Sequence, residues 1–262
     1  LSKELVEGDQ ITASGPRSDR GDELTARYGV HSTIHNHKAV KGQDVVVLSV
    51  KPQLMPTVMD ELRGTLKPDC YVVSIAAGLT ISRIVDAIGH KAVVRVMPNT
   101  PSQIGEGMSV WTATEAVTES QLMATQSILS ALGEDVHVDD ERYLDMATAV
   151  SGTGPAYILL FMEAMIDAGV HLGFSRRVAE QLVMQTMKGT VAYVREAGKH
   201  PATLRNEVTS PGGTSAEALY HLEKGGLRTV MARAIWAAYQ RSAALGGSDL
   251  GRRLAGQSPD GE

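Results

Sequence analysis

Cysteine is almost absent from this sequence of 262 residues, which contains only Cys70. A single thiol excludes a disulfide within the chain and a metal site made of several thiolates, and it is typical of a reducing compartment. Aromatic residues are also scarce, at 4%. Aliphatic side chains must therefore form the core, and the 11 methionines are suited to filling gaps between them.

Neither a large positive charge nor a long apolar run is present. The 25 Lys and Arg residues are outnumbered by 30 Asp and Glu, which gives a net charge of −5, and the basic residues are scattered. This pattern argues against a nucleic-acid partner and against an anionic membrane surface. No uninterrupted apolar run approaches the roughly 18 residues of a membrane span, so we expect no membrane association. The length suits one large or two ordinary globular domains.

The first half contains alternating strand and helix patterns. Strands are expected at residues 11–14, 44–50, 71–76, 92–96 and 135–138, and helices at 21–28, 52–63, 81–88 and about 119–132. The continuous apolar run 44–50 predicts a strand covered on both faces. Thr80 is placed to cap one helix, and Thr118 with Gln121 forms a capping box for another, which Gly133 can end. Residues 1–138 are therefore predicted to form an α/β, Rossmann-like, doubly wound domain with a mostly parallel sheet.

A glycine-rich loop, G-x-G-x-x-G, is missing from this half. In a dinucleotide-binding domain that loop follows the first strand and begins the first helix. Residues 1–6 have the pattern of a helix end closed by Gly8, and the chain begins with Leu1, so we expect the first strand and its loop to lie upstream. Loss of that central strand would leave two unpaired strand edges, so the sequence is predicted to be a fragment of a longer chain. We expect a cytoplasmic location and leave organelle targeting open.

The carboxyl ends of the predicted strands, where ligands bind in open α/β sheets, are small, polar or glycine-bearing. They fall at residues 14–18, 49–52, 74–78 and 95–101. Arg17, Ser18 and Arg20 follow the first visible strand, where a domain that binds NAD usually has an acidic residue. This cluster suits the 2′-phosphate of NADP, and it suits a solvated turn equally well.

The second half has helix patterns only. Residues 139–246 are predicted to form an all-α domain, with an interruption at 151–155 and helices at about 155–172, 175–197 and 227–245. Ser175 and Gly198 are suited to the two ends of the second of these. The helix 155–172 carries apolar residues on more than one face, which indicates burial against another chain. Residues 247–262 are predicted to be a disordered tail.

The segment Ser210-Pro211-Gly212-Gly213-Thr214-Ser215 opens a short helix expected at 215–224. Adjacent glycines at a helix N-terminus form a small site for a carboxylate or a phosphate, and the hydroxyls of Ser210, Thr214 and Ser215 surround it. Alternatively, Thr214 and Glu217 form a capping box and the glycines only a turn. The residues alone leave both interpretations open.

Other chemistry has weaker support. His35 and His37 lack an obvious third ligand, so no metal site is predicted. The G-x-S-x-G motif of a serine hydrolase is absent from the sequence. The paired carboxylates of Asp139 and Asp140 stand where a helix is expected to start, and capping explains them.

Five blocks resemble the pyrroline-5-carboxylate reductase family in their order and spacing: SVKPQ (49–53), SIAAG (74–78), RVMPNTP (95–101), SGTGPAY (151–157) and HPATLRNEVTSPGGTSAEAL (200–219). They cover nearly the whole chain to about residue 245, and the last block is the family's specific signature. The resemblance implies hydride transfer from NADPH, or from NADH, to the C=N carbon of Δ1-pyrroline-5-carboxylate, which gives L-proline. It also implies a homodimer with intertwined helical domains, assembled in many members into decamers.

The resemblance further implies the site residues. The substrate carboxylate is expected on the N–H groups of Gly213 and Thr214, close to Ser210 and Gly212, with the Ser215 hydroxyl as the catalytic group near the ring nitrogen. Cofactor contacts are expected from Ser14, Asn36, Ser49, Val50, Lys51, Pro52, Ala76, Ala77, Gly78 and Asn99, to which the cationic cluster adds Arg17 and Ser18.

Several positions depart from the family pattern. Ser215 stands where Thr is usual and keeps the hydroxyl, Glu207 stands where Asn, Gln or Asp is common, and Thr153 replaces the commoner Ser. Without the glycine loop, a protein of these residues alone is expected to bind NADPH poorly. Two alternatives stay open. One is a related NADP-dependent imine or β-hydroxyacid oxidoreductase with Lys188 as its base, and the other is a truncated, non-catalytic form that only dimerises.

Overall fold

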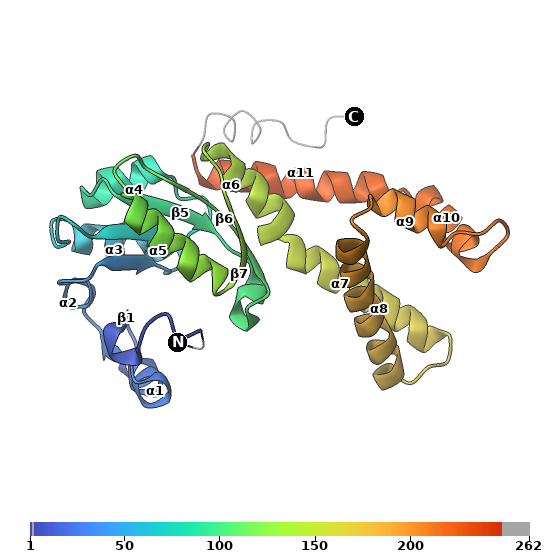
Figure 1. Ribbon diagram of the computed structural model, residues 1–262, viewed down its shortest axis with the longest axis horizontal. Coiled ribbons are helices and arrows are strands. Elements are labelled where there is room, and N and C mark those ends of the chain that lie inside the picture. The colour runs from blue at the N-terminus through green and yellow to red at the C-terminus, as the bar shows by residue number, and fades with distance from the viewer. Residues whose placement is uncertain (2, 248–262) are drawn as a thin grey trace. The chain divides into compact units, whose positions relative to one another are not determined.

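The computed structural model describes residue 1 and residues 3–247. The chain divides into two compact units, one formed by residues 1–153 together with the described residues from Ala238 on, and the other by Gly154–Ala237. Figure 1 shows the sheet strands in the first unit and helices only in the second. The tail expected at 247–262 lies outside the described residues, except for Gly247.

Two sheets form the first unit. Strands β1 (Thr12–Ser14) and β2 (His31–Thr33) pair in parallel as a sheet of two. A second sheet has five strands in chain order: β3 (Val45–Leu48), β4 (Tyr71–Ser74), β5 (Val93–Met97), β6 (Gly107–Ala113) and β7 (Gly133–His137). All neighbouring pairs of this sheet are parallel except β5 and β6. The predicted α/β class with a mostly parallel sheet is confirmed.

Helices cover both faces of the five-stranded sheet. Helices α3 (Met55–Leu62) and α4 (Ile81–Ile88) contribute to one buried cluster with Val72 and Val93, and α5 (Glu119–Ser130) contributes Leu129 to another with Val94 and Trp111. Cys70 lies in the first cluster with no exposed surface, and burial raises the pKa of its thiol to about 11. The thiol is therefore protonated at neutral pH and is not a nucleophile.

Local capping signals were partly correct. The capping box of α5 is confirmed, because the Thr118 hydroxyl accepts from the Gln121 N–H at 3.3 Å and the Gln121 amide accepts from the Thr118 N–H at 2.9 Å. Thr80 precedes α4 as predicted, but its hydroxyl lies 3.2 Å from that of Ser82 and does not cap the helix. The Ile81 N–H instead donates to Glu141, 60 residues away.

Besides the Thr80 cap, four expectations in this unit were wrong. Residues 3–6 form turns and bends, followed by a 3-10 turn at Gly8–Gln10, so no helix ends there. Gly133 does not end α5, which closes at Ala131. Gly133 begins β7 with φ 143°, and an added Cβ would lie 2.1 Å from the Gly107 carbonyl oxygen. Strand β3 is not covered on both faces, because Val47 is 53% exposed on this edge strand.

The fourth error is the omission of β2 and β6, which the sequence patterns did not indicate. Strand β6 carries Ser109 and Thr112 in buried positions, so its polar residues do not mark the exposed face. A helix, α1 (Ser18–Tyr28), ends at Gly29 as predicted, and a short helix, α2 (Asn36–Ala39), follows β2. These elements place the ends of β1 and β2 beside the start of α1.

The interruption expected at 151–155 is a π-helical turn, Thr148–Gly152. It joins α6 (Arg142–Ala147) to α7 (Gly154–His171), so helical structure is continuous over Arg142–His171. The Thr153 hydroxyl donates to the Thr148 carbonyl at 2.8 Å, which stabilises the turn. Among the described residues this stretch of 30 residues is the one long and apolar enough to cross a membrane by length and composition, and only 6% of its most apolar part is buried.

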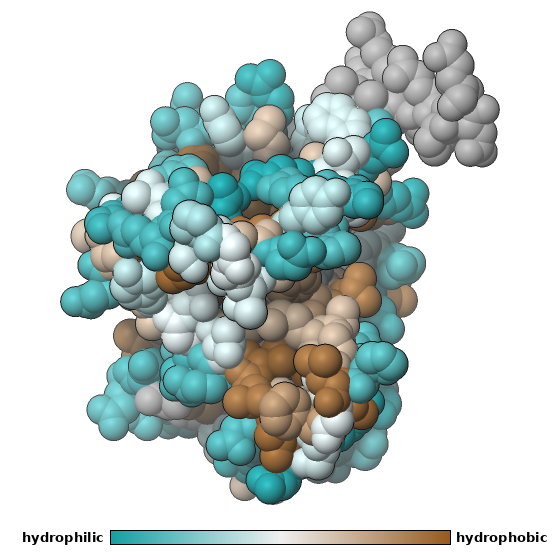
Figure 2. Space-filling model, turned by 90° about the vertical axis from the view of Figure 1, so that its right-hand side faces the viewer, coloured by the Kyte–Doolittle hydropathy of each residue, from teal (hydrophilic) through white to brown (hydrophobic). Residues whose placement is uncertain are grey.

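The second unit consists of helices. Helix α8 (Arg176–Ala197) begins with Ser175 as its predicted cap, which accepts from the Val178 N–H, and ends at Gly198. It is followed by α9 (Pro201–Glu207), which was not predicted, α10 (Thr214–Lys224) and α11 (Leu227–Leu245), whose last residues belong to the first unit. Large apolar side chains of α7, such as Leu159 at 63% and Leu160 at 67%, are exposed. Figure 2 shows a patch of apolar residues on the face that it draws.

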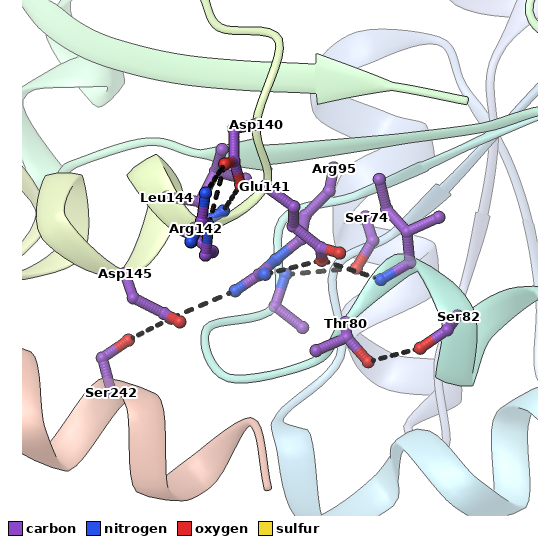
Figure 3. Close-up of polar contacts among 12 residues, drawn as sticks. Ser74, Thr80, Ser82, Arg95, Asp140, Glu141, Arg142, Leu144, Asp145 and Ser242 are labelled. Carbon is purple, nitrogen blue, oxygen red and sulfur yellow. Dashed lines mark hydrogen bonds and ion pairs between the residues drawn. The ribbon is translucent and has the colours of Figure 1, made fainter. Parts of the chain in front are cut away.

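A buried cation connects four elements of the first unit. Arg95 on β5 has a side chain that is 2% exposed, and it donates to Glu141 at 2.7 Å and lies 3.5 Å from Asp145. Asp145 accepts from Ser242 near the end of α11 at 2.8 Å, and Glu141 also accepts from the Ile81 N–H at 2.8 Å. Figure 3 shows these groups converging from β5, α6, α4 and α11. The network fixes the loop and helix ends around the centre of the sheet.

Replacement of Arg95 by methionine should lower the free energy of unfolding by about 3–5 kcal/mol, because it leaves two partly buried carboxylates without their cation. Urea unfolding of the purified protein measures this loss. Arg142, whose side chain is 85% exposed and pairs with Asp140, is the control. Its replacement by methionine should leave the midpoint nearly unchanged, and equal losses for the two variants would contradict the role of burial.

Candidate cofactor and substrate sites

A cavity of about 820 Å³ lies where β1 and β2 end and α1 begins. Its lining comes from the residues after β1, the first turns of α1, the end of β2 and one residue after β3: Ala13, Ser14, Gly15, Pro16, Arg17, Ser18, Arg20, Gly21, Asp22, Leu24, Ser32, Thr33, Ile34 and Lys51. The cavity is therefore at the carboxyl ends of parallel strands, where an open α/β sheet binds its ligands.

Positive charge dominates this lining. The lining contains three cationic residues, Arg17, Arg20 and Lys51, and one carboxylate, Asp22. The Arg20 guanidinium bonds to Glu23 at 2.5 Å and holds the pKa of that carboxyl below its usual range, so Arg20 is already paired. The Arg17 side chain is 69% exposed, and its contact with Asp19 is long, at 4.0 Å. Arg17 is therefore able to turn toward a ligand. No side chain caps the start of α1, so the partial positive charge of its N–H groups adds to the cationic side chains.

A chain of hydrogen bonds lies at the edge of the cavity. The Ser14 hydroxyl donates to the Asn36 side-chain carbonyl at 2.7 Å, and the Asn36 amide nitrogen donates to Glu61 on α3 at 2.8 Å. Ser14 and Asn36 were both expected at the cofactor site, but their contact was not predicted. Glu61 was missed, because an exposed acidic residue on a helix carries no local signal of a partner 25 residues away.

The residues named in advance for cofactor binding do not all gather in this cavity. Ser14, Arg17, Ser18 and Lys51 line it, and Asn36 bonds to its lining. Seven others do not line it: Ser49, Val50, Pro52, Ala76, Ala77, Gly78 and Asn99.

Two of these seven have structural contacts of their own. The Asn99 side chain donates to the Ser151 carbonyl at 3.2 Å and accepts from the Met108 N–H at 2.9 Å, so it braces β6 and the π-helical turn. Gly78 has φ 69°, and an added Cβ would lie 2.5 Å from the Cβ of Leu245. The need for glycine at this position is therefore explained by backbone conformation and packing.

The turn before α10 contains the residues named for substrate binding. Gly212 has φ 70°, and the Gly213 N–H donates to the Ser210 carbonyl at 3.1 Å. A Cβ on Gly213 would lie 2.6 Å from the Ser210 hydroxyl oxygen, which can rotate away, and 3.2 Å from the Ser210 carbonyl oxygen, so the turn leaves little room for a side chain there. Ser215, in the first turn of α10, is half-buried.

The capping box proposed for Thr214 and Glu217 was wrong. The helix begins one residue earlier than expected, with Gly213 as its cap and Thr214 as its first residue, and no side chain caps it. The N–H groups of the first turn are thus left for another acceptor, which suits a carboxylate. Glu207, the unusual residue near this segment, forms an ion pair with Lys199 at 2.8 Å.

In the part of the chain that the structure describes, no three His, Cys, Asp or Glu side chains lie close enough together to hold a metal ion. The rings of His35 and His37 lie 5.6 Å apart.

Comparisons with known proteins agree over nearly the whole chain. A family model for pyrroline-5-carboxylate reductase dimerisation matches residues 141–245, and one described as NADP oxidoreductase, coenzyme F420-dependent, matches residues 1–78. The pyrroline-5-carboxylate reductase of Synechocystis sp. is 39% identical over 246 residues, which cover 94% of this chain and 91% of the relative. The pyrroline-5-carboxylate reductase of Pseudomonas aeruginosa is 41% identical over 246 residues, which cover 94% of this chain and 90% of the relative.

A solved structure agrees as well. The crystal structure of Plasmodium falciparum pyrroline carboxylate reductase with NADP bound superposes with a TM-score of 0.86 at 31% identity. The match covers 94% of this chain and 90% of that chain.

Gly78 and Gly89 allow packing to be separated from backbone strain. Both have positive φ, but an added Cβ meets Leu245 at position 78 and nothing within 4 Å at position 89. Gly89→Ala should lower the free energy of unfolding by about 1–2 kcal/mol, from the left-handed backbone alone. Gly78→Ala should lower it further, as measured by urea unfolding, and equal losses would show that the contact with Leu245 is unimportant.

Proposed function

Because the chain belongs to the pyrroline-5-carboxylate reductase family, we propose that it reduces Δ1-pyrroline-5-carboxylate to L-proline, the last step of proline synthesis. The proposal for the site is supported by the turn before α10, where two glycines precede a helix whose first N–H groups no side chain caps. Such a turn suits a small carboxylate. A bound nicotinamide supplies the hydride that the C=N carbon accepts. The protein mainly has to orient the imine and exclude water.

The substrate carboxylate binds the N–H groups of Gly213 and Thr214, beside the Ser210 hydroxyl and the backbone of Gly212. Support comes from the start of α10, which no side chain caps. The Gly213 N–H donates to the Ser210 carbonyl at 3.1 Å and exchanges this bond for one to the substrate carboxylate. The Ser215 hydroxyl, one residue further on, donates a hydrogen bond or a proton to the ring nitrogen as the C=N bond is reduced. A neutral turn of this kind suits a monoanion, because N–H groups satisfy a carboxylate without a cation.

The cofactor is NADPH, with NADH as the poorer alternative. The residues present fit a 2′-phosphate, since Arg17, Ser18 and Lys51 line one cavity at the uncapped start of α1. Ser14 and Asn36 belong to the same site. The strand ends Ser49, Val50 and Pro52, the segment Ala76, Ala77 and Gly78, and Asn99 border the rest of the nucleotide.

The assembly is a homodimer, and dimers associate further into decamers. Support comes from the exposed apolar residues of α7 and α8 and from the match to a dimerisation model. We assign cofactor binding to residues 1–138 and substrate binding and dimerisation to residues 139–246, in an enzyme of the cytoplasm, although the compact units of the structure divide after Thr153 and after Ala237.

Ser215→Ala should lower kcat for pyrroline-5-carboxylate by about a hundredfold, because the hydroxyl that assists the ring nitrogen is removed. The measurement is the loss of NADPH absorbance under steady-state conditions. Ser215→Thr keeps the hydroxyl and should retain most of the activity. Full activity in the alanine variant, or equal loss in both variants, would contradict the role assigned to the hydroxyl.

Arg17→Ala should raise KM for NADPH by about threefold to tenfold and leave KM for NADH unchanged, because only NADPH carries the 2′-phosphate. Arg27, on the same helix but outside the cavity lining, is the matched control for loss of one positive charge. Parallel changes for the two cofactors, or an equal effect of Arg27→Ala, would place the phosphate elsewhere.

A further inference from the structure

Glu61 has no part in the site described so far except through Asn36. It lies on α3, on an exposed surface, and accepts from the Asn36 amide nitrogen at 2.8 Å. Asn36 in turn accepts from the Ser14 hydroxyl at 2.7 Å, and Ser14 lines the cavity at the start of α1. The three residues form one chain of hydrogen bonds from α3 to the cavity.

The chemistry of the three groups fixes the direction of this chain. An ionised carboxylate has acceptor atoms only, so Asn36 must turn its NH₂ group toward Glu61. The Asn36 carbonyl oxygen then faces Ser14 and takes the hydroxyl proton of that residue. With its proton committed, the Ser14 oxygen has only lone pairs left for a ligand.

We propose that Glu61 is a positioning residue that makes Ser14 an acceptor-only contact, so that this point of the cavity takes a hydrogen-bond donor of the nucleotide, such as a ribose hydroxyl, and not a phosphate oxygen. The inference deepens the proposed function and rests on it. It divides the cavity into two parts. Arg17 and the start of α1 receive the anion, and Ser14 receives a sugar hydroxyl.

A purely structural role for Glu61 makes a different prediction. If the carboxylate only ties the short helix α2 to α3, its loss affects stability and cofactor affinity to the same extent whether or not Ser14 is present. If it acts through Ser14, its effect on affinity disappears once the Ser14 hydroxyl is gone. A double-mutant cycle separates the two cases.

The experiment measures NADPH affinity by calorimetry in the full natural chain for Ser14→Ala, Glu61→Leu and the double variant, with thermal unfolding in parallel. Each single variant should weaken binding by about threefold to tenfold, the loss of one or two hydrogen bonds, and the double variant should be no weaker than Ser14→Ala alone. Glu61→Gln keeps an acceptor but adds a donor, so the Asn36 amide can turn either way, and its effect should be intermediate. Asp60→Asn, the neighbouring acid on α3, controls for the loss of charge and should leave affinity unchanged.

Additive losses in the double variant, or an unchanged affinity in Ser14→Ala, would overturn the inference. An equal loss in Asp60→Asn would also overturn it, since long-range charge would then explain the effect. Activity of the unmodified enzyme with pyrroline-5-carboxylate is measured in the same preparation. If it binds and oxidises NADPH while the cycle is additive, only this inference fails, and if it binds no NADPH, the proposed function fails as well.

Discussion

The Arg95 guanidinium is buried against the five-stranded sheet, where almost no water reaches it, so its charge has to be neutralised by nearby carboxylates. Several elements of the first unit contribute to that neutralisation. Arg95 pairs with Glu141 and Asp145, both from the stretch where α6 begins. The same Glu141 oxygen also accepts the first N–H of α4, and Asp145 also holds Ser242 at the end of α11. One charge therefore fixes one strand and three helices, and removing it would leave carboxylates whose burial is then uncompensated.

The two anion sites that we propose have the same local structure but differ in charge. Helices α1 and α10 both begin without a side-chain cap, so each presents unsatisfied N–H groups. Around α1 these groups are joined by Arg17 and Lys51, which suits a phosphate carrying close to two negative charges. The turn before α10 contributes glycines and hydroxyls and no cationic side chain, which suits a single carboxylate. We infer that this difference in charge directs a phosphorylated cofactor to one site and a small acid to the other.

Features with a local signal could be predicted from the sequence. The caps at Thr118 and Ser175, the ends of α1 and α8, and the extent of α11 all follow from residues adjacent in the chain. Strands β2 and β6 could not, because their stability comes from pairing with distant strands, and β6 buries hydroxyls that resemble a loop. The same limit applied to the site. Arg17 and Ser18 were found by position, whereas Glu61 and Arg95 depend on partners far along the chain.

The most direct test of the account is the oxidation of NADPH by the purified full natural chain, with and without Δ1-pyrroline-5-carboxylate, together with identification of the product. We expect substrate-dependent oxidation, formation of L-proline in equal amount, and faster reaction with NADPH than with NADH. A folded protein that binds NADPH but shows no substrate-dependent oxidation and forms no proline would contradict it.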